Sequence, residues 1–181
     1  MKELSLNILD IAENSVKAKA KNVKIEIIET EDMLKFSVSD DGVGMKPDFL
    51  AAVTNPFTTT RTTRPVGLGI PLLKMAAEQT GGTVEISSRH IDLEPHNHGT
   101  ETVAYFYKNH IDFVPLGDIV ETMTTLIGGN ADMDFDFSHT TEEKTVTLNT
   151  KEMRVILGDV PLNSIEVILW IRDYLNEQYS N

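Results

Sequence analysis

An α+β fold, a two-layer sandwich with helices covering one face of a sheet, is the architecture that this sequence predicts. Three observations lead to it. Short alternating apolar runs form strand pairs, runs with helical periodicity lie between those pairs, and the order is helix, hairpin, helix, loop, helix, hairpin. Strict alternation of strands and helices, as in a doubly wound sheet, is absent from this order.

The first helix is predicted over residues 3–20, because apolar side chains recur there at helical spacing. That buried stripe consists of Leu4, Ile8, Ile11, Ala12, Ser15 and Val16. A second, polar stripe shares one face of the same helix and consists of Glu3, Asn7, Asp10, Asn14 and Lys17.

Runs rich in β-branched or aromatic residues predict strands at 22–28, 33–39, 83–88 and 101–107. A hairpin turn is predicted at 29–32 and a short helix after Pro47. Residues 54–66, dense in Thr, Pro and Arg, predict a loop, and Gly69–Thr80 predicts a helix that stops at a Gly pair.

A composition shift near residue 110 predicts a domain boundary at 108–115. The two parts are an N-terminal domain, 1–109, and a small C-terminal α/β extension, 110–181, whose role the sequence does not assign, with partner binding and dimerisation as the open alternatives. Within the extension the pattern predicts helices at 116–129, 151–157 and 164–178 and strands at 132–137 and 144–150. We interpret Met133, Phe135 and Phe137 as core, and the all-round apolar run 167–171 predicts burial on several sides, as at a subunit interface.

Composition excludes several classes of function. The chain carries 28 acidic and 16 basic side chains, a formal charge of −12, which opposes binding to nucleic acid. It has no cysteine, so disulfides and thiolate metal sites are excluded. No signal peptide and no membrane-spanning run is recognisable, and we expect a cytoplasmic protein with no membrane partner.

The segment Asp40-Asp41-Gly42-Val43-Gly44 follows a predicted strand and, alone, is equally typical of a tight turn. It is not a Rossmann fingerprint, because position 47 is Pro where a third glycine is required. Walker-type and protein-kinase glycine loops are absent. His96 and His98 offer two metal-ligating side chains, although a solvent loop that happens to hold histidines explains them better.

Three blocks in order carry a family resemblance: "LNILDIAENSVKAKAKNVKIEI", "VSDDGVGM" and "NPFTTTRTTRPVGLGIPLLKMAAEQTGGTVEISS", followed by "HGTETVAYFY". Over about residues 3–107 the chain resembles the GHKL ATPase superfamily, which includes histidine kinases, anti-sigma-factor kinases, gyrase, heat-shock chaperones and mismatch-repair ATPases. The resemblance implies the Bergerat fold, a mixed sheet with helices on one face, and a site for ATP and Mg²⁺.

The resemblance also implies roles for single residues. Asp40 accepts a hydrogen bond from the adenine amine, and Gly42 and Gly44 let the backbone approach the ligand. Asn14 is the Mg²⁺ ligand and Lys17 a phosphate contact. The remaining implied ATP contacts are Arg61 (or Arg64) in the lid, Gly67, Leu68 and Gly69 at a helix N-terminus, and Thr100, whose hydroxyl supports Asp40.

Position 10 departs from the family pattern. ATP-hydrolysing members carry a glutamate as general base four residues before the N-box asparagine, and here Asp10 stands in its place. Asp10 is the candidate catalytic base, with a ligand role beside Asn14 as the alternative, since base catalysis depends on reach. The second glycine box departs as well, because Val66 replaces the usual threonine.

No helical hairpin with a phosphoacceptor histidine fits before Leu4, so we expect the chain to act on a separate protein. The first hypothesis is a Mg·ATP-dependent protein kinase-like regulator, similar to anti-sigma-factor kinases, acting on Ser or His of that partner. The alternative is an ATP-gated interaction module with little turnover, and a domain with a decayed site is a third interpretation. The sequence leaves open whether the chain forms a homo-oligomer.

Overall fold

The computed structural model describes residues 3–54 and 68–181, so the predicted lid lies almost wholly outside the described residues. The helices are α1 (Leu4–Lys17), α2 (Pro47–Thr54), α3 (Gly69–Gln79), α4 (Ile119–Gly129), α5 (Thr150–Leu157) and α6 (Ile165–Ser180). The strands are β1 (Asn22–Glu29), β2 (Met33–Asp40), β3 (Thr83–Arg89), β4 (Gly99–Tyr107), β5 (Asp134–Thr140) and β6 (Thr145–Asn149). Every predicted helix and strand in the described ranges is present.

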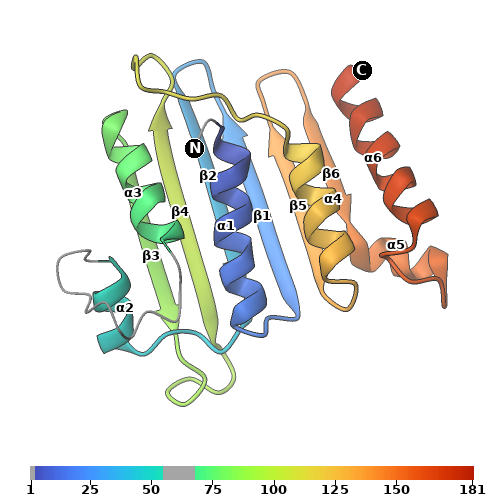
Figure 1. Cartoon of the computed structure of the whole chain (residues 1–181), viewed down its shortest axis with the longest axis horizontal. Helices are drawn as coiled ribbons and strands as arrows, with labels where there is room; N and C mark the ends of the chain where they lie inside the picture. Colours follow the sequence, from blue (N-terminus) through green and yellow to red (C-terminus); the bar gives the residue numbers. More distant parts are fainter. Residues whose placement is uncertain (1–2, 55–67) are drawn as a thin grey trace.

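The six strands form one mixed sheet in the order β3-β4-β2-β1-β5-β6. All neighbouring pairs are antiparallel except β1 and β5, which run parallel with Ile25 opposite Phe137. Figure 1 shows α1, α3 and α4 side by side on one face of this sheet, with α6 beyond β6. The predicted α+β sandwich with helices on one face is therefore confirmed.

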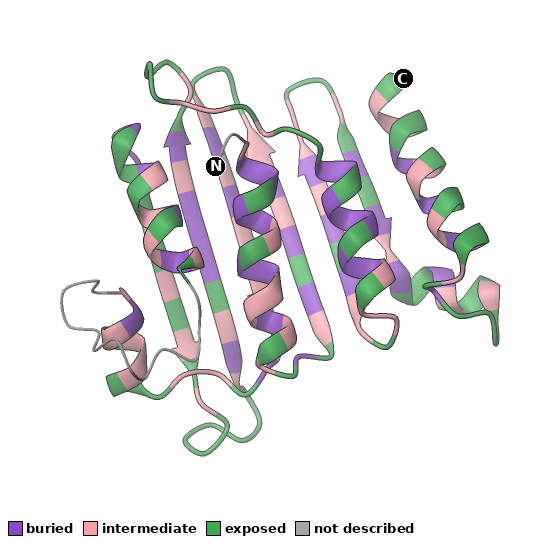
Figure 2. Cartoon of the chain, viewed as in Figure 1, coloured by how far each residue is buried: buried purple, intermediate pink, exposed green. Residues whose placement is uncertain are grey.

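The alternation of the strands fixes which face is buried. In β1 the side chains of Val23, Ile25 and Ile27 are buried, whereas the intervening residues are partly exposed or exposed. Figure 2 shows the same alternation along the sheet and buried residues along α1. Half-buried antiparallel strands of this kind keep one face in solvent, and here the polar face lies away from the helices.

The sheet is continuous across the predicted boundary at 108–115. β5, in the C-terminal part, pairs along its length with β1, and its Phe135 and Phe137 lie in the common core. The segment after β4 returns to the start of α1, where the amides of Leu4 and Ser5 donate to the carbonyls of Pro115 and Leu116 at 2.9 and 2.8 Å. The C-terminal part thus extends the same sheet and helix layer.

Within the described ranges, no helix has both the length and the apolar character needed to cross a bilayer.

A buried polar cluster joins the two parts at the far end of β1. His139 of β5 is almost fully buried; its Nδ1 lies 2.8 Å from the Tyr179 hydroxyl and its Nε2 lies 3.3 Å from Glu29 Oε1. Lys108 donates to the other Glu29 oxygen at 3.2 Å. The His139 imidazole holds the pKa of the Glu29 carboxyl below its usual value against the opposing effect of burial, and Lys108 adds to this. Burial, and then the Glu29 charge, raise the pKa of Tyr179.

Because the pKa of Glu29 is lower in the folded than in the unfolded chain, its ionised form stabilises the fold above the usual pKa of 4.5, and that stabilisation is lost as the pH falls through the folded pKa. We therefore expect Glu29→Gln to lower the melting temperature at pH 7 and to show a progressively smaller deficit below about pH 4.5. Thermal melts from pH 3 to 7 measure this. The exposed Glu142→Gln is the matched control, and a deficit for Glu29→Gln that stays constant across this range would contradict the interpretation.

Candidate functional site

A cavity of about 270 Å³ lies between α1, the end of β2, α2, the start of α3 and β4. This volume is close to that of the smallest ligand pockets, roughly 300 Å³. Its walls are mostly apolar, with a few polar groups that converge on it. The lining residues are Ile11, Asn14, Ser15, Lys17, Ala18, Val38, Asp40, Val43, Gly44, Met45, Phe49, Ile70, Thr100 and Thr102. Five of the predicted site residues therefore line one cavity: Asn14, Lys17, Asp40, Gly44 and Thr100.

The Asp40 carboxylate is held from two sides. Ser15, one residue beyond Asn14 on α1, donates its hydroxyl to Oδ2 at 2.6 Å, and the Gly42 amide donates to Oδ1 at 2.8 Å. A carboxylate has about four acceptor positions, so two such bonds leave both oxygens able to accept another donor. The arrangement orients Asp40 without exhausting its capacity to bind a ligand.

The Thr100 hydroxyl, which the resemblance implies supports Asp40, makes its hydrogen bond to another residue in this structure. Thr100 lies opposite Asp40 in the β2–β4 pairing, but its Oγ1 shares a 2.7 Å hydrogen bond with Ser88 Oγ. Ser88 also accepts from the Met45 amide at 2.7 Å, so the Thr100 hydroxyl belongs to a link between β3, β4 and the loop after Gly44. Ser15, which helical periodicity assigned to the buried stripe, supports Asp40 instead.

Protein contacts account for the two glycines of the turn after β2. A Cβ on Gly42 would lie 2.7 Å from the Ala18 Cβ, so α1 and the turn could not pack as they do. Gly44 has φ of +76°, a conformation that favours glycine, and a Cβ there would overlap the Arg89 carbonyl. Both glycines are required for close packing within the protein, which is a different reason from the backbone–ligand approach that the resemblance implies.

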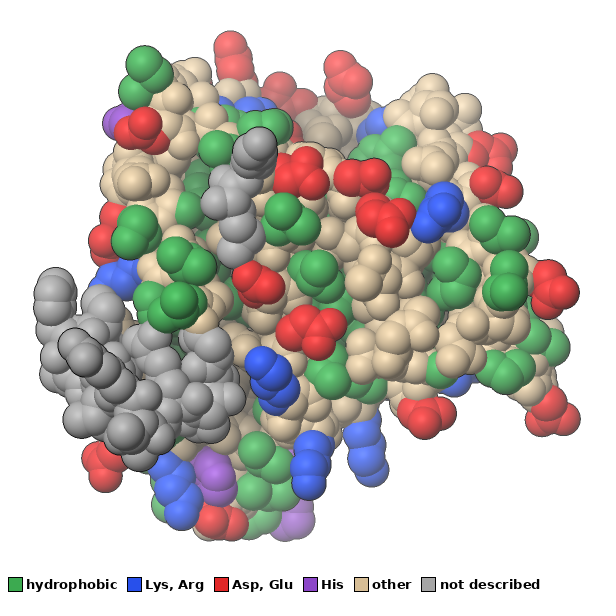
Figure 3. All heavy atoms as spheres, viewed as in Figure 1, with side chains coloured by type: hydrophobic (Ala, Val, Ile, Leu, Met, Phe, Trp, Pro, Cys, Tyr) green, Lys and Arg blue, Asp and Glu red, His purple; other side chains and the backbone are tan. Residues whose placement is uncertain are grey.

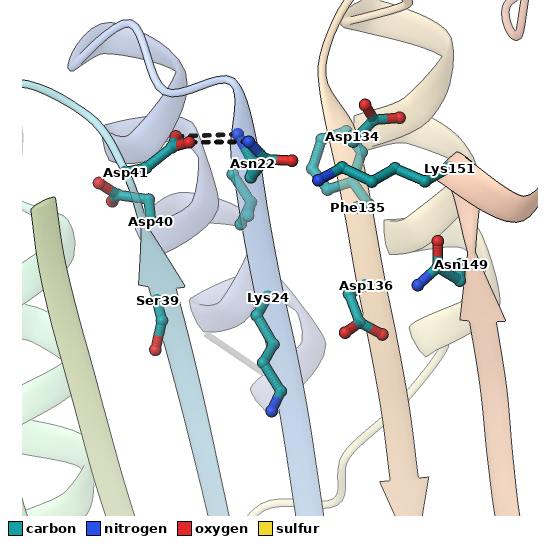
Figure 4. A pocket seen from close by; sticks show the side chains of 11 residues that line it. Asn22, Lys24, Ser39, Asp40, Asp41, Asp134, Phe135, Asp136, Asn149 and Lys151 are labelled. Carbon is teal, nitrogen blue, oxygen red and sulfur yellow. Dashed lines mark hydrogen bonds between the residues drawn. The ribbon is translucent and has the colours of Figure 1, made fainter. Parts of the chain in front are cut away.

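Asp41 has a structural function that the sequence did not suggest, since the sequence pattern around it indicates only a tight turn. Its Oδ1 accepts from the amides of Lys21 and Asn22 at 2.8 and 2.9 Å, and its Oδ2 accepts from Asn22 Nδ2 at 2.8 Å. Figure 4 shows Asp41 and Asn22 facing each other where β1 begins. Burial opposes ionisation, but these three donors outweigh it and lower the pKa of Asp41.

Figure 4 also shows a second hollow, about 300 Å³, on the face of the sheet away from the helices. Two of its acidic side chains, Asp41 and Asp134, are engaged within the protein. Asp41 accepts from Asn22, and Asp134 accepts from Arg154 Nε at 2.7 Å and from the Thr150 hydroxyl at 2.8 Å. We assign this hollow no part in the candidate site.

The other predicted residues lie around or outside the cavity. Asp10 is exposed on α1, and a Cβ on Gly69 would lie 3.4 Å from the Asp10 Cβ, so Asp10 sits against the first turn of α3. Leu68 is the N-cap of α3, where its side chain accepts no hydrogen bond from the first helical amides. Arg61, Arg64 and Gly67 lie outside the described residues.

The loop between β3 and β4 braces the glycine turn. His98 Nδ1 lies 2.6 Å from the Gly42 carbonyl oxygen, which can only accept, so Nδ1 carries the proton of this bond. The Ile91 amide donates to the Val43 carbonyl at 2.8 Å. Within the described part of the chain, no group of three or more acidic or His side chains has the arrangement of a metal site.

Comparisons with known proteins agree with this geometry. The family model described as "Histidine kinase-, DNA gyrase B-, and HSP90-like ATPase" matches residues 2–110, more than half of the chain. The chain therefore belongs to this ATPase family. Its residues 2–110 are an ATP-binding domain of the histidine kinase-like class, and the GHKL resemblance is confirmed.

One similar protein is a putative NtrY-like sensor histidine kinase of Rickettsia bellii, which is 27% identical to this chain over 88 residues. The match covers 48% of this chain and 14% of the relative. The sensor histidine kinase ZraS of Escherichia coli K12 is 31% identical over 84 residues, or 45% of this chain and 18% of the relative. The matched region is thus less than a fifth of either protein. In fold, the chain is similar to the MutL ATPase domain of Aquifex aeolicus complexed with ADP, with a TM-score of 0.52 and 17% identity over 82% of this chain and 63% of that one.

We expect Asp41→Ala to lower the free energy of unfolding by about 1–3 kcal/mol, because it leaves the Asn22 and Lys21 donors without their acceptor. Urea unfolding at pH 7 measures the loss. Glu85→Ala, at an exposed position of β3, is the control and should change stability by about 0.5 kcal/mol or less. An Asp41→Ala protein as stable as the control would contradict the assigned function of Asp41.

Proposed function

We propose that this chain binds Mg·ATP in the cavity at the end of β2 and acts on a separate protein as a regulatory, protein kinase-like component of the anti-sigma-factor-kinase type. The observation that carries the proposal is the Asp40 carboxylate, held by Ser15 and the Gly42 amide on the wall of an apolar cavity. A fixed acceptor beside apolar walls suits a flat base with an exocyclic amine, and Phe49 and Met45 supply apolar contact.

The polar groups near the base site suit a metal-bound triphosphate. Asn14 and Lys17 line the same cavity from successive turns of α1, and they supply a neutral oxygen and a cation. Mg²⁺ prefers oxygen ligands and keeps several waters, so one amide oxygen together with phosphate oxygens is an adequate set. When bound, Mg²⁺ neutralises charge on the phosphates, and Lys17 and the lid cations would add to this.

The start of α3 is a second phosphate contact in this proposal. Among the described residues, no side chain caps the amides of Gly69 and Ile70 at the start of the helix, where they would face an anion, and Pro71 has no amide to offer. Asp10 lies against this same turn, which would set it beside the terminal phosphate and not beside the base. This location supports the assignment of Asp10 as the group that accepts a proton from the attacking hydroxyl or water.

We expect Asp40→Asn to reduce Mg·ATP affinity at least tenfold, because its amide replaces an acceptor oxygen with a donor. Ser15→Ala should weaken binding about tenfold to a hundredfold, since a hydrogen bond to a charged group contributes about 1.5–3 kcal/mol. Isothermal titration calorimetry measures both, and Ser87→Ala, at an exposed position of β3, is the matched control. Unchanged affinity in Asp40→Asn would overturn the proposed site.

A substitution of Asp10 distinguishes an effect on ATP binding from an effect on turnover. We expect Asp10→Ala to bind Mg·ATP within about twofold of the wild type but to lower phosphoryl transfer or hydrolysis by about 10²–10⁴-fold, the usual contribution of a general base. Labelled ATP, incubated with the chain alone and with proteins encoded beside its gene, gives both rates. Equal turnover in Asp10→Ala would show that Asp10 is not the base. No turnover in the wild type under any of these conditions would favour the alternative, an ATP-gated interaction module.

A further inference from the structure

The part of the chain furthest from the candidate site has an apolar surface that the described chain leaves uncovered. We define the C-terminal patch as Val155, Ile156, Val160, Ile165, Leu169 and Trp170, on α5, the α5–α6 connection and α6. Ile156 is 87% exposed, Val155 85% and Ile165 78%, and the other three are about half exposed. Exposed large apolar side chains that gather on neighbouring elements in this way mark interaction sites on monomers.

Three residues of the patch, Ile156, Val160 and Trp170, line a groove. A hollow of about 400 Å³ lies between α5 and α6, with Met153 and Val167 as its buried floor and Ile156, Leu157, Val160 and Trp170 as its walls. Glu166 is its single charged lining residue. The Trp170 ring stacks on Tyr174 with centroids 4.9 Å apart and planes 10° from parallel, so this wall is a preformed flat surface.

The first two turns of α6 have the composition of a helix that is buried on several sides. Residues 165–171 are apolar on all sides except at Glu166, and a helix of that kind is ordinarily buried. Here Val167 and Ile171 are buried, but Leu169 and Trp170 remain about half exposed, so the described part of the chain does not bury this helix on several sides. Figure 2 shows α6 as largely exposed or intermediate, and Figure 3 shows hydrophobic side chains at the surface on that side of the molecule.

The charged side chains around the groove favour a basic partner over a second copy of this acidic chain. The two arginines nearby are already paired, Arg154 with Asp134 at 2.7 Å and Arg172 with Glu121 at 3.0 Å. The acidic side chains Asp159, Glu166 and Asp173 are exposed around the patch. A second copy of a chain with net charge −12 would bring like charges together there, which opposes association.

We propose that the α5–α6 groove is a docking site for an amphipathic helix of another protein, whose apolar stripe fills the groove and whose flanking Lys and Arg side chains face Glu166 and its acidic neighbours. Amphipathic helices commonly bind in grooves with apolar walls between two helices of the receptor. The bound helix places apolar side chains in such a groove at positions i, i+3 or i+4, and i+7. The surface lies at the β6 edge of the sheet, three strands away from β2, which carries Asp40, so the inference goes beyond the proposed ATP function and stands without it.

The probe is an acetylated, amidated 18-residue peptide without tryptophan, with Leu on one helical face and Lys on both flanks. Two peptides control for charge and pattern: one has Glu in place of Lys, and one has the Leu/Lys composition scrambled to remove the apolar face. Trp170 is the only tryptophan of the chain, so its fluorescence reports occupancy of the groove directly. Titrations are run without nucleotide and repeated with Mg·ATP, so that the result does not depend on the ATP site.

We expect saturable binding of the Leu/Lys helix with a blue shift of Trp170 emission, and binding at least tenfold weaker for the Leu/Glu and scrambled peptides. Ile156→Lys should weaken the Leu/Lys helix at least tenfold. Ile111→Lys, the same change at a residue that is 95% exposed and outside the patch, should have no effect. Glu166→Lys should weaken the Leu/Lys helix and strengthen the Leu/Glu helix. Far-ultraviolet circular dichroism verifies that each variant is folded.

Three outcomes would overturn the proposal. The scrambled or Leu/Glu peptide could bind as tightly as the Leu/Lys helix, which would remove the claim of helical and charge recognition. Binding could be unchanged in Ile156→Lys, which would locate the contact elsewhere. Sedimentation velocity could show a dimer at micromolar concentration that Ile156→Lys dissociates, which would make a second copy the occupant.

Discussion

The candidate site depends on how two adjacent aspartates hold the end of β2. Asp40 ties this strand end to α1 through Ser15, and Asp41 ties it to the start of β1 through Asn22. The two carboxylates point to different sides because successive residues of an extended chain do so. The Asp40 carboxylate lines the cavity beneath α1, while the Asp41 carboxylate bonds to the start of β1. Because β2 lies between β4 and β1, this double attachment sets the positions of the cavity walls relative to one another.

The parallel pairing of β1 with β5 has a different consequence. It adds β5, β6 and the helices around them to the sheet of the ATP-binding domain without covering the polar face. α4 packs on α1 and α6 packs on α4, so the helix layer is continuous from the cavity to the far edge. His139, Glu29 and Tyr179 lock the end of α6 to β1. The start of α6, with its apolar residues, remains outside that locked region.

Much of the fold follows from the sequence because its signals are local. Alternation identified each strand, and helical spacing identified each helix, with ends correct to within a few residues. The motif spacing identified Asn14, Lys17, Asp40, Gly44 and Thr100, which line one cavity. The sequence could not reveal partners set by tertiary packing. Ser15 looked like an ordinary buried-stripe residue, and its bond to Asp40 joins positions 25 apart. The Ala18 and Arg89 contacts that require Gly42 and Gly44, and the Asn22 contacts of Asp41, are equally non-local.

The acidic composition and the apolar patch are physically connected. A chain with an uncovered apolar surface is prone to self-association, and a net charge of −12 opposes that association through mutual repulsion. The same charge does not oppose a basic partner, which it attracts at long range and whose helix the groove then accepts at short range. Since the repulsion weakens as salt screens it while apolar burial does not, selectivity for a basic helix over a second copy is greatest at low ionic strength. Charge and shape at this end of the sheet therefore act together as a single selectivity mechanism.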